Sequence, residues 1–248
     1  MRTTRQTYID SNFEAARSQG CDTIQLKFDG WWARWQIEKG VARVFTRTGR
    51  ELPDFAFQAK QDITATIVGE LMHGTNWAQE PRIKGKTFAF DVWSVDEVDL
   101  ADAPYKDRYG ILRALLKRMP PSFIRVENFP IFDYSSIWDR FVDKGDYEGV
   151  VFRYSKGRID TPIYRQKNVV VGQEIATGFE EGEGKFVGML GAVVCQSGAR
   201  VGGGWDNDER FDIWTNQAKY LGKSFEVEGR KRFEETGLLR HPNFVRWL

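Results

Sequence analysis

Short apolar runs, each bounded by Gly, Pro or Asp, recur along the sequence and constrain its fold more than any other feature. Several of them alternate apolar with polar residues, which is typical of β-strands because successive side chains of a strand point to opposite faces of a sheet. Up to about residue 168 we expect strands at 23–28, 32–37, 42–45, 67–71, 87–93, 124–132 and 149–153. This part of the chain is therefore predicted to be rich in sheet.

Three stretches between these runs have a helical period instead. They are 55–64, 105–119 and 137–144, and Ser135 and Ser136 precede the last of them as the expected N-cap. The order of the elements predicts a mixed α+β fold built from hairpins rather than from repeated strand–helix–strand units.

Beyond about residue 168 the strand-like runs are separated by glycines. They lie at 169–176, 185–195, 199–202 and 224–230, with one helical stretch at 209–221. Roughly 80 residues of short strands with a single helix are typical of a small Greek-key barrel such as an OB-fold. We therefore predict two domains, 1–168 and 169–248, the second of them an OB-fold.

The composition excludes several classes of protein. The 36 Lys and Arg residues nearly balance the 35 Asp and Glu residues, so any affinity for nucleic acid must come from locally placed basic side chains. The two cysteines, Cys21 and Cys195, exclude a disulfide framework and a four-thiolate zinc site. A polar N-terminal stretch and the absence of a long apolar run predict a cytoplasmic protein with no membrane partner.

Lys27 ends a strand-like run in the motif Lys-Phe-Asp-Gly at 27–30. A lysine is a nucleophile only where its surroundings favour the neutral amine, and in isolation this motif is typical of a surface hairpin turn. Five further motifs follow in order, and each places charged or aromatic residues beside a strand. They are Thr-Arg-Thr-Gly at 46–49, Val-Gly-Glu-Leu at 68–71, Phe-Ala-Phe-Asp-Val-Trp at 88–93, Glu-Gly-Val-Val-Phe-Arg at 148–153 and Tyr-Arg-Gln-Lys at 164–167.

In order and spacing, the six motifs resemble the nucleotidyltransferase motifs of ATP-dependent DNA ligases and messenger-RNA capping enzymes. Segments 182–192, 201–210, 220–223 and 239–246 are similar to the OB domain of small viral and phage DNA ligases. The resemblance implies a nucleotidyltransferase, or adenylation, domain of antiparallel sheets with flanking helices, followed by a C-terminal OB-fold β-barrel.

The resemblance also implies roles for the residues that match the motifs. Lys27 would attack the α-phosphorus of ATP and carry the covalent AMP, and Asp29 would orient and later release the nucleotide. Glu70 and Glu148 match carboxylates that recognise the ribose and bind Mg²⁺ or Mn²⁺. Phe90 would stack on adenine, although its strand pattern also fits a plain core aromatic.

Basic residues of the motifs would hold phosphates. Arg165 and Lys167 match the residues that hold the α-phosphate, and Arg47 matches the one that binds the 5′-phosphate at a nick. Arg50 fits a contact with DNA and a solvated turn equally well. Such cations suit phosphoryl-type transfer, which depends mostly on positioning and on neutralising charge.

The sequence departs from the family pattern at three places. Trp32 stands where the family has an arginine, and Arg34, on the same strand face, is a candidate to replace it. Arg165 stands where the family usually has lysine. The terminal motif lacks the usual Asp-Lys pair, which leaves Arg240 and Arg246 as alternatives for orienting the pyrophosphate leaving group.

The leading hypothesis is an ATP-dependent DNA ligase that seals 3′-OH/5′-phosphate nicks in duplex DNA through lysyl-AMP and DNA-adenylate. We expect a monomer that acts in DNA replication or repair in the cytoplasm, or in the host cytoplasm if it is viral. The alternatives are an RNA ligase or a capping-type nucleotidyltransferase, which share the core motifs, and a non-catalytic OB-fold protein that binds DNA.

Overall fold

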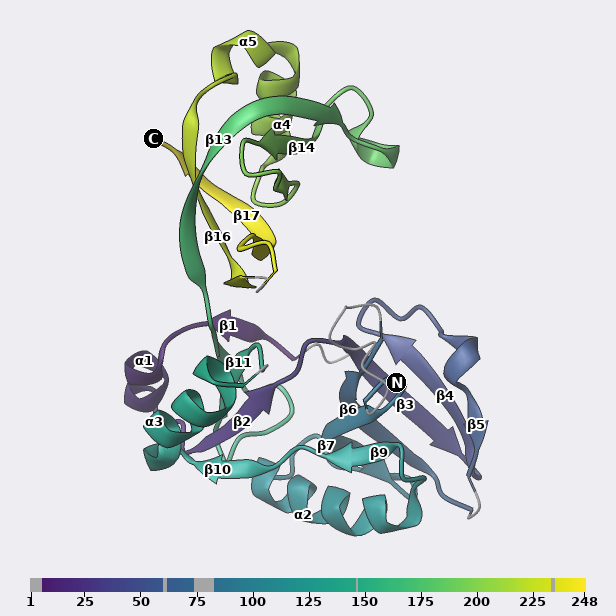
Figure 1. The fold of residues 1–248 in the computed structure, drawn as a ribbon. Coiled ribbons are helices and arrows are strands. Elements are labelled where there is room, and N and C mark those ends of the chain that lie inside the picture. Colours follow the sequence, from purple (N-terminus) through teal and green to yellow (C-terminus); the bar gives the residue numbers. More distant parts are fainter. Residues whose placement is uncertain (1–5, 60–61, 74–82, 146, 233–234) are drawn as a thin grey trace. The chain divides into compact units, whose positions relative to one another are not determined.

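The computed structural model describes residues 6–59, 62–73, 83–145, 147–232 and 235–248. The chain forms two compact units, 1–167 and 168–248. Both are rich in sheet and contain few helices (Figure 1), so the expectation of a mixed α and β fold is confirmed. Among the described residues, no helix is both long and apolar enough to cross a membrane.

A seven-stranded sheet, here called the large sheet, belongs to the first unit. Helix α2 (Tyr105–Leu115) packs on one of its faces, where Leu112 contacts a core that includes Ala33, Trp35 and Ile37, which alternate along one strand. In order across the sheet, the strands are β5 (Phe57–Gln58), β4 (Val41–Thr46), β3 (Trp31–Glu38), β6 (Ala65–Leu71), β7 (Thr87–Val95) and β8 (Val98–Asp99), with β9 (Phe123–Arg125) parallel to β7.

A second sheet of the same unit, here called the small sheet, has five strands. They are, in order, β1 (Tyr8–Asp10), β12 (Ile163–Lys167), β11 (Gly149–Arg153), β2 (Thr23–Lys27) and β10 (Asn128–Pro130). Ile24, Val150 and Phe152 point to a core shared with α1 (Phe13–Ser18) and α3 (Tyr134–Ile137). The residues that alternate with them project from the opposite face, which forms the site described below.

The second unit is built around the long strand β13 (Val170–Glu181). Its first half pairs with β16 (Ser224–Arg232), and from Ala176 onward it pairs with β14 (Leu190–Cys195). The stacked rings of Trp205 and Phe244, with centroids 3.8 Å apart, lie in the core. The remaining elements are β15 (Arg200–Val201), which pairs with β14, β17 (Leu239–Trp247), which pairs with β16, and the helices α4 (Asn207–Thr215) and α5 (Gln217–Tyr220).

The prediction of a helix at 55–64 is wrong. The chain instead forms one 3₁₀ turn at Pro53–Phe55 and then the short strand β5. The ring of Phe57 packs against Trp35 and Phe123, with centroids 5.5 and 5.6 Å away. Packing between distant segments thus overrides the weak local period.

Other boundaries also differ from the expectation. Residues 60–61 of the expected helix lie outside the described residues. The strand expected at 124–132 is two strands, β9 and β10, because the chain passes there from the large sheet to the small one. Ser135 and Ser136 do not cap a helix, since a 3₁₀ turn leads directly into α3 at Tyr134.

Two elements of the second unit are shorter than expected. The helix predicted at 209–221 is interrupted at Asn216, where the backbone leaves the helical conformation, and forms α4 and α5. The strand predicted at 185–195 begins only at Leu190, because a 3₁₀ turn occupies Gly184–Phe186. The segment 239–247, which was not predicted as a strand, forms β17.

A buried ion pair joins the large sheet to α2. Asp91 of β7 is completely buried and Arg108 of α2 is 1% exposed. Arg108 donates from Nε and Nη2 to the two carboxylate oxygens of Asp91, at 2.9 and 3.0 Å. Its Nη1 donates to the carbonyl oxygens of Ala103 and Gly157, at 2.6 and 3.1 Å. The pair therefore links β7, α2 and the loop that follows β11.

A buried charge that loses its partner is strongly destabilising, so we expect Arg108→Met to lower the free energy of unfolding by about 3–5 kcal/mol. Urea denaturation measures this loss, with Arg113→Met on the exposed side of α2 as the matched control. The double variant Asp91→Leu with Arg108→Met should recover only part of the loss, because the buried Arg153, whose Nη1 lies 3.8 Å from Asp91, then loses that carboxylate. Equal free energies of unfolding for Arg108→Met and the control Arg113→Met would contradict a stabilising role for the pair.

Candidate active site

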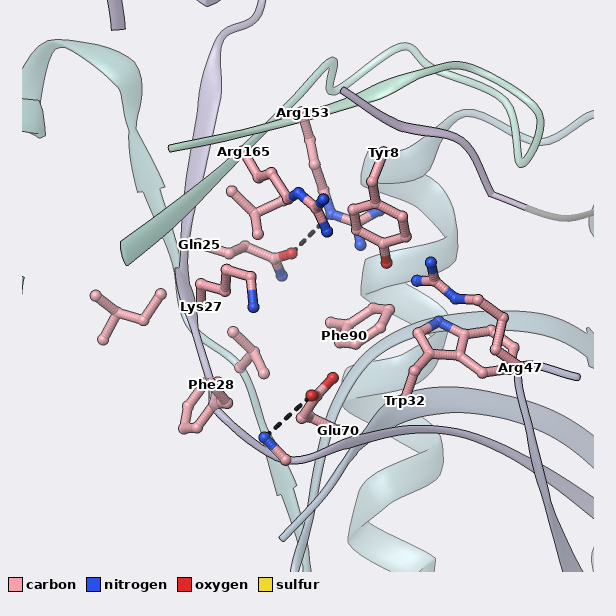
Figure 2. Close-up of a pocket in the computed structure, with 14 residues that line it drawn as sticks. Tyr8, Gln25, Lys27, Phe28, Trp32, Arg47, Glu70, Phe90, Arg153 and Arg165 are labelled. Carbon is pink, nitrogen blue, oxygen red and sulfur yellow. Dashed lines mark hydrogen bonds between the residues drawn. The ribbon is translucent and has the colours of Figure 1, made fainter. Parts of the chain in front are cut away.

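A pocket of about 210 Å³ lies in the first unit and is lined by residues of both sheets (Figure 2). Charged side chains of both signs and aromatic rings therefore face one small cavity. The described residues that line it are Tyr8, Gln25, Leu26, Lys27, Phe28, Gly30, Trp32, Arg47, Glu70, Phe90, Val126, Val151, Arg153 and Arg165.

Lys27 ends β2, and its amine points into the pocket (Figure 2). The amine donates a hydrogen bond to the carboxylate of Glu148. The Glu148 side chain is only 2% exposed, and its backbone N–H donates to the carbonyl oxygen of Lys27 at 3.1 Å. A carboxylate that can accept the proton of Lys27 is therefore in direct contact with it.

Gly149 explains how these two residues meet. It stands opposite Lys27 of β2 and opposite Lys167 of β12, at the point where three strands come together. Its φ is 154°, and a Cβ at this position would lie 2.0 Å from the carbonyl oxygen of Gln166. Only glycine permits this approach, and the approach places Glu148 directly beside Lys27.

Glu70 lies on β6, opposite Trp32 of β3, and its carboxylate faces the same cavity. The backbone N–H of Gly30 donates to its Oε1 at 3.2 Å. Burial raises the pKa of Glu70 to about 7, and the nearby charge of Lys27 and the bond from Gly30 only partly oppose this rise. Glu70 therefore changes charge in the pH range where enzymes usually work.

Phe90 reaches the pocket from an irregular point of β7. Ala89 and Asp91 pair with consecutive residues of β6, so Phe90 is the extra residue of a β-bulge. In a regular strand Val92 would share a face with Phe90, two residues earlier. Because of the bulge, Val92 instead packs in the same core as Ala89. Phe90 is 9% exposed, and the guanidinium carbon of Arg153 lies 5.2 Å from the centroid of its ring. Phe90 belongs both to a buried cluster and to the wall of the pocket.

Arg47 lies just beyond β4, beside two aromatic rings. Its guanidinium carbon is 4.6 Å from the ring centroid of Tyr8 and 5.7 Å from that of Trp32. Trp32, which stands where the resembled family has arginine, thus contributes a ring to the surroundings of Arg47. Tyr8 precedes all six motifs, so no motif points to it.

Arg165 and Lys167 project from the same face of β12, two residues apart. Arg165 donates from Nε and Nη2 to Oδ1 and Oδ2 of Asp10, at 2.6 and 3.1 Å. These bonds hold the pKa of the Asp10 carboxyl below its usual value. Asp10 belongs to β1, and nothing in the sequence links it to a residue that lies 155 positions away.

Two further polar residues of the pocket have a detectable sequence signal. Gln25 is the polar member of an apolar alternation and shares a face of β2 with Lys27. Arg153 ends the motif at 148–153, and its Nε donates to Oε1 of Gln25 at 2.7 Å. Gln25 in turn donates from Nε2 to the hydroxyl of Tyr105, at 2.8 Å. Both residues are buried and connect the pocket to the core.

Three other predicted site residues of the first unit are not among the described residues that line the pocket. Asp29 is buried in the turn that follows β2. Arg34 lies two residues beyond Trp32 on β3, with its guanidinium carbon 5.5 Å from the ring centroid of Phe45. Arg50 is exposed in the turn after β4, where its backbone N–H donates to Oγ1 of Thr46 at 3.1 Å.

Arg240 and Arg246 belong to β17 of the second unit. Arg240 stands opposite Arg230 of β16, so two like charges face each other across the strands. Arg246 donates from Nη2 to the carboxylate of Glu226 at 3.1 Å.

Glu70 and Glu148 both interact with Lys27, whose amine donates to Glu148 and whose charge partly opposes the rise that burial causes in the pKa of Glu70. Among the described residues, no group of three or more His, Cys, Asp and Glu side chains could hold a metal ion. Mg²⁺ commonly takes one or two carboxylates, several waters and substrate phosphates. These two glutamates therefore fit Mg²⁺ when a nucleotide supplies further oxygen ligands.

No protein-family model matches the sequence, and neither does any curated protein. The fold is similar to a solved structure described as "DNA binding with a minimal scaffold: Structure-function analysis of Lig E DNA ligases", with a TM-score of 0.67 and 20% identity over 98% of this chain and 99% of the other. It is also similar to "Pmar-Lig_PreS3", with a TM-score of 0.63 and 17% identity over 98% of this chain and 67% of the other. A third similar structure is "mycobacterial DNA ligase D complexed with ATP and MES", with a TM-score of 0.54 and 16% identity over 100% of this chain and 96% of the other.

The fold is thus that of solved DNA ligases. The resemblance to ATP-dependent DNA ligases that the motifs indicate is confirmed for the fold. At this level of identity the comparison concerns architecture, and the role of each residue depends on the geometry of the pocket.

The raised pKa of Glu70 predicts a pH-dependent stability. The folded protein retains a proton on Glu70 up to a pKa of about 7, whereas the ordinary value is 4.5, so stability falls as the pH rises through this interval. Glu70→Gln removes the titration and should become more stable than wild type by about 1–3 kcal/mol as the pH passes 7.

Urea denaturation with a chelator present, repeated from pH 4 to pH 8, measures this difference. Glu38→Gln, at the exposed end of β3, is the matched control. A difference between Glu70→Gln and wild type that stays constant over the whole range would contradict the prediction.

Proposed function

We propose that this protein is an ATP-dependent DNA ligase that seals 3′-OH/5′-phosphate nicks in duplex DNA. Residues 1–168 would form the adenylation domain and residues 169–248 an OB-fold domain. The observation that carries the proposal is the contact between the Lys27 amine and the Glu148 carboxylate, beside a pocket that Glu70, Phe90 and Arg165 line. The fold shared with DNA ligases, one of them complexed with ATP, supports it.

The first step would be the adenylation of Lys27. The amine must lose a proton before it can attack, and the Glu148 carboxylate is in contact to accept it. The neutral nitrogen would then form a bond to the α-phosphorus of ATP while the bond to pyrophosphate breaks, and pyrophosphate would leave with that electron pair. Arg165 and Lys167 would neutralise charge on the α-phosphate.

The next two steps would use the nick. AMP would pass from Lys27 to the 5′-phosphate, and the 3′-hydroxyl would then attack that phosphate and release AMP. Arg47 would bind the 5′-phosphate, Asp29 would orient the nucleotide, and Phe90 would stack on adenine. Arg50, in the turn that follows β4, would contact the DNA backbone.

Mg²⁺ or Mn²⁺ would be held by Glu70 and Glu148 together with the nucleotide phosphates. When bound, the cation would supply the charge that neutralises the pyrophosphate leaving group. Arg240 or Arg246 would orient the same leaving group from the second domain.

The sealing of a singly nicked DNA duplex in the presence of ATP and Mg²⁺ tests the proposal. The same nick placed in an RNA strand distinguishes a DNA ligase from an RNA ligase. Labelling of the protein by α-labelled ATP but not by α-labelled GTP distinguishes ligation from capping. DNA binding without labelling or sealing would favour the non-catalytic alternative.

Lys27→Ala should abolish transfer of label from α-labelled ATP to the protein, because the covalent nucleophile is lost. Sealing of a pre-adenylated nick should partly survive, since that step does not need the amine. Lys27→Arg should fail in the same way, because guanidinium stays protonated. Lys106→Ala, exposed on α2, is the control, and undiminished labelling of Lys27→Ala would remove Lys27 from its role.

Arg47→Ala should weaken binding to a nick with a 5′-phosphate by about 10- to 100-fold, the effect of one charge-assisted contact. Binding to a nick without the phosphate should change little. The slope of log affinity against log salt concentration should fall by nearly one unit, about 0.9 per phosphate contact. Fluorescence anisotropy over a salt series measures both effects, with exposed Arg43→Ala of β4 as the control. Equal losses on both nicks would show that Arg47 does not read the phosphate.

A further inference from the structure

Strand β1 contributes two side chains to the surroundings of the pocket from an edge of the small sheet. It pairs in parallel with β12, so that Asp10 lies beside Arg165. Tyr8 and Asp10 are two residues apart and project from the same face of the strand. Ile9, between them, projects from the other face and is 38% exposed.

The ring of Tyr8 lies between two arginines (Figure 2). Its centroid is 4.6 Å from the guanidinium carbon of Arg47 and 5.9 Å from that of Arg165. The negative face of an aromatic ring attracts a guanidinium group, and the planar group can stack on it. Tyr8 therefore restricts the orientation of both cations, and Trp32 adds a second ring beside Arg47.

Asp10 holds one edge of Arg165. It accepts from Nε and Nη2, at 2.6 and 3.1 Å, in the two-bonded geometry that a guanidinium group and a carboxylate share. The guanidinium group is planar and rigid, so its remaining nitrogen, Nη1, lies on the side away from these two bonds. The N–H groups of Nη1 are suited to a phosphate oxygen. Asp10 can thus orient Arg165 without blocking it.

We propose that Tyr8 and Asp10 are positioning residues that hold Arg47 and Arg165 ready to bind phosphate groups. The inference rests on the proposed function, because it takes Arg165 as the ligand of the α-phosphate of ATP and Arg47 as the ligand of the 5′-phosphate. A flexible side chain that is ordered in advance does not lose its freedom on binding, which corresponds to an affinity gain of roughly two- to tenfold per side chain.

The ATP dependence of protein labelling tests Asp10. Asp10→Asn and Asp10→Ala remove the same charge, but only asparagine retains an oxygen that can accept from Arg165. We expect KM for ATP to rise about tenfold in Asp10→Ala and less in Asp10→Asn, with kcat nearly unchanged. Ile9→Thr is the control and should match wild type. A fall in KM, or equal changes in both Asp10 variants, would overturn the inference, because Asp10 would then act only through its charge.

The preference for a 5′-phosphate tests Tyr8. Tyr8→Phe retains the ring, whereas Tyr8→Leu removes it while keeping an apolar side chain. The ratio of affinities for nicks with and without the phosphate should fall about tenfold in Tyr8→Leu and stay at the wild-type value in Tyr8→Phe. If the affinity ratio for nicks with and without the 5′-phosphate falls in Arg47→Ala but stays at the wild-type value in Tyr8→Leu, the positioning inference is wrong and the proposed function stands.

A measurement that does not depend on enzyme activity distinguishes the positioning role of Tyr8 and Asp10 from the proposed ligase function. In isotope-labelled protein, the Nε–H resonances of Arg47 and Arg165 should shift in Tyr8→Leu, because the ring is gone, and remain in place in Tyr8→Phe. Titration with AMP, whose phosphate corresponds to the α-phosphate of ATP, should show about tenfold weaker binding to Asp10→Ala than to wild type. If the resonances shift and Asp10→Ala binds more weakly, but the wild type does not seal nicks, the proposed function is contradicted while the positioning of the arginines is supported. Unchanged resonances and unchanged AMP affinity would overturn the inference.

Discussion

The carboxylate of Asp91 lies in the interior of the first unit, and side chains from distant parts of the chain converge on it. Arg108 donates two hydrogen bonds, Gln6 donates from Nε2 at 3.2 Å, and Nη1 of Arg153 lies 3.8 Å away. A charge without access to water persists only where such partners compensate it. Because Arg153 also binds Gln25, and both line the pocket, one wall of the site is part of the network that holds Asp91.

The hydrogen bonds around Asp91 also position Phe90 and Lys27, the two residues expected to contact a nucleotide. Phe90 directly precedes Asp91 on β7, so the bulge that turns its ring toward the pocket is anchored by the buried carboxylate. Gln25 lies two residues before Lys27 on β2, and its amide is engaged by Arg153 and Tyr105. The strand that presents Lys27 is therefore held by hydrogen bonds on the face toward the pocket, and such rigidity suits the nucleophilic role proposed for Lys27.

Much of the fold could be predicted because its signals are local. The alternation of apolar and polar residues predicted β2, β3, β4, β6, β7 and β11 to within a few residues, since it depends only on neighbours in the chain, but it missed β1, β5, β8 and β12. The helix predicted from a helical period at 55–64 is absent because the ring of Phe57 packs on residues of other strands, and the single strand predicted at 124–132 is absent because one apolar run serves two sheets. In both places the competing contacts come from residues far away in the sequence.

The sequence by itself determined the motifs, and with them the residues Lys27, Glu70 and Phe90 that the structure brings to one pocket. These residues lie in short motifs whose order and spacing resemble those of ATP-dependent DNA ligases, and that resemblance selected them before the fold was known. Only the tertiary structure decided that Asp10 meets Arg165 and that the ring of Tyr8 lies between two arginines. Those contacts depend on the parallel pairing of β1 with β12, and strand pairing between distant segments is set by the packing of the whole unit rather than by residues adjacent in sequence.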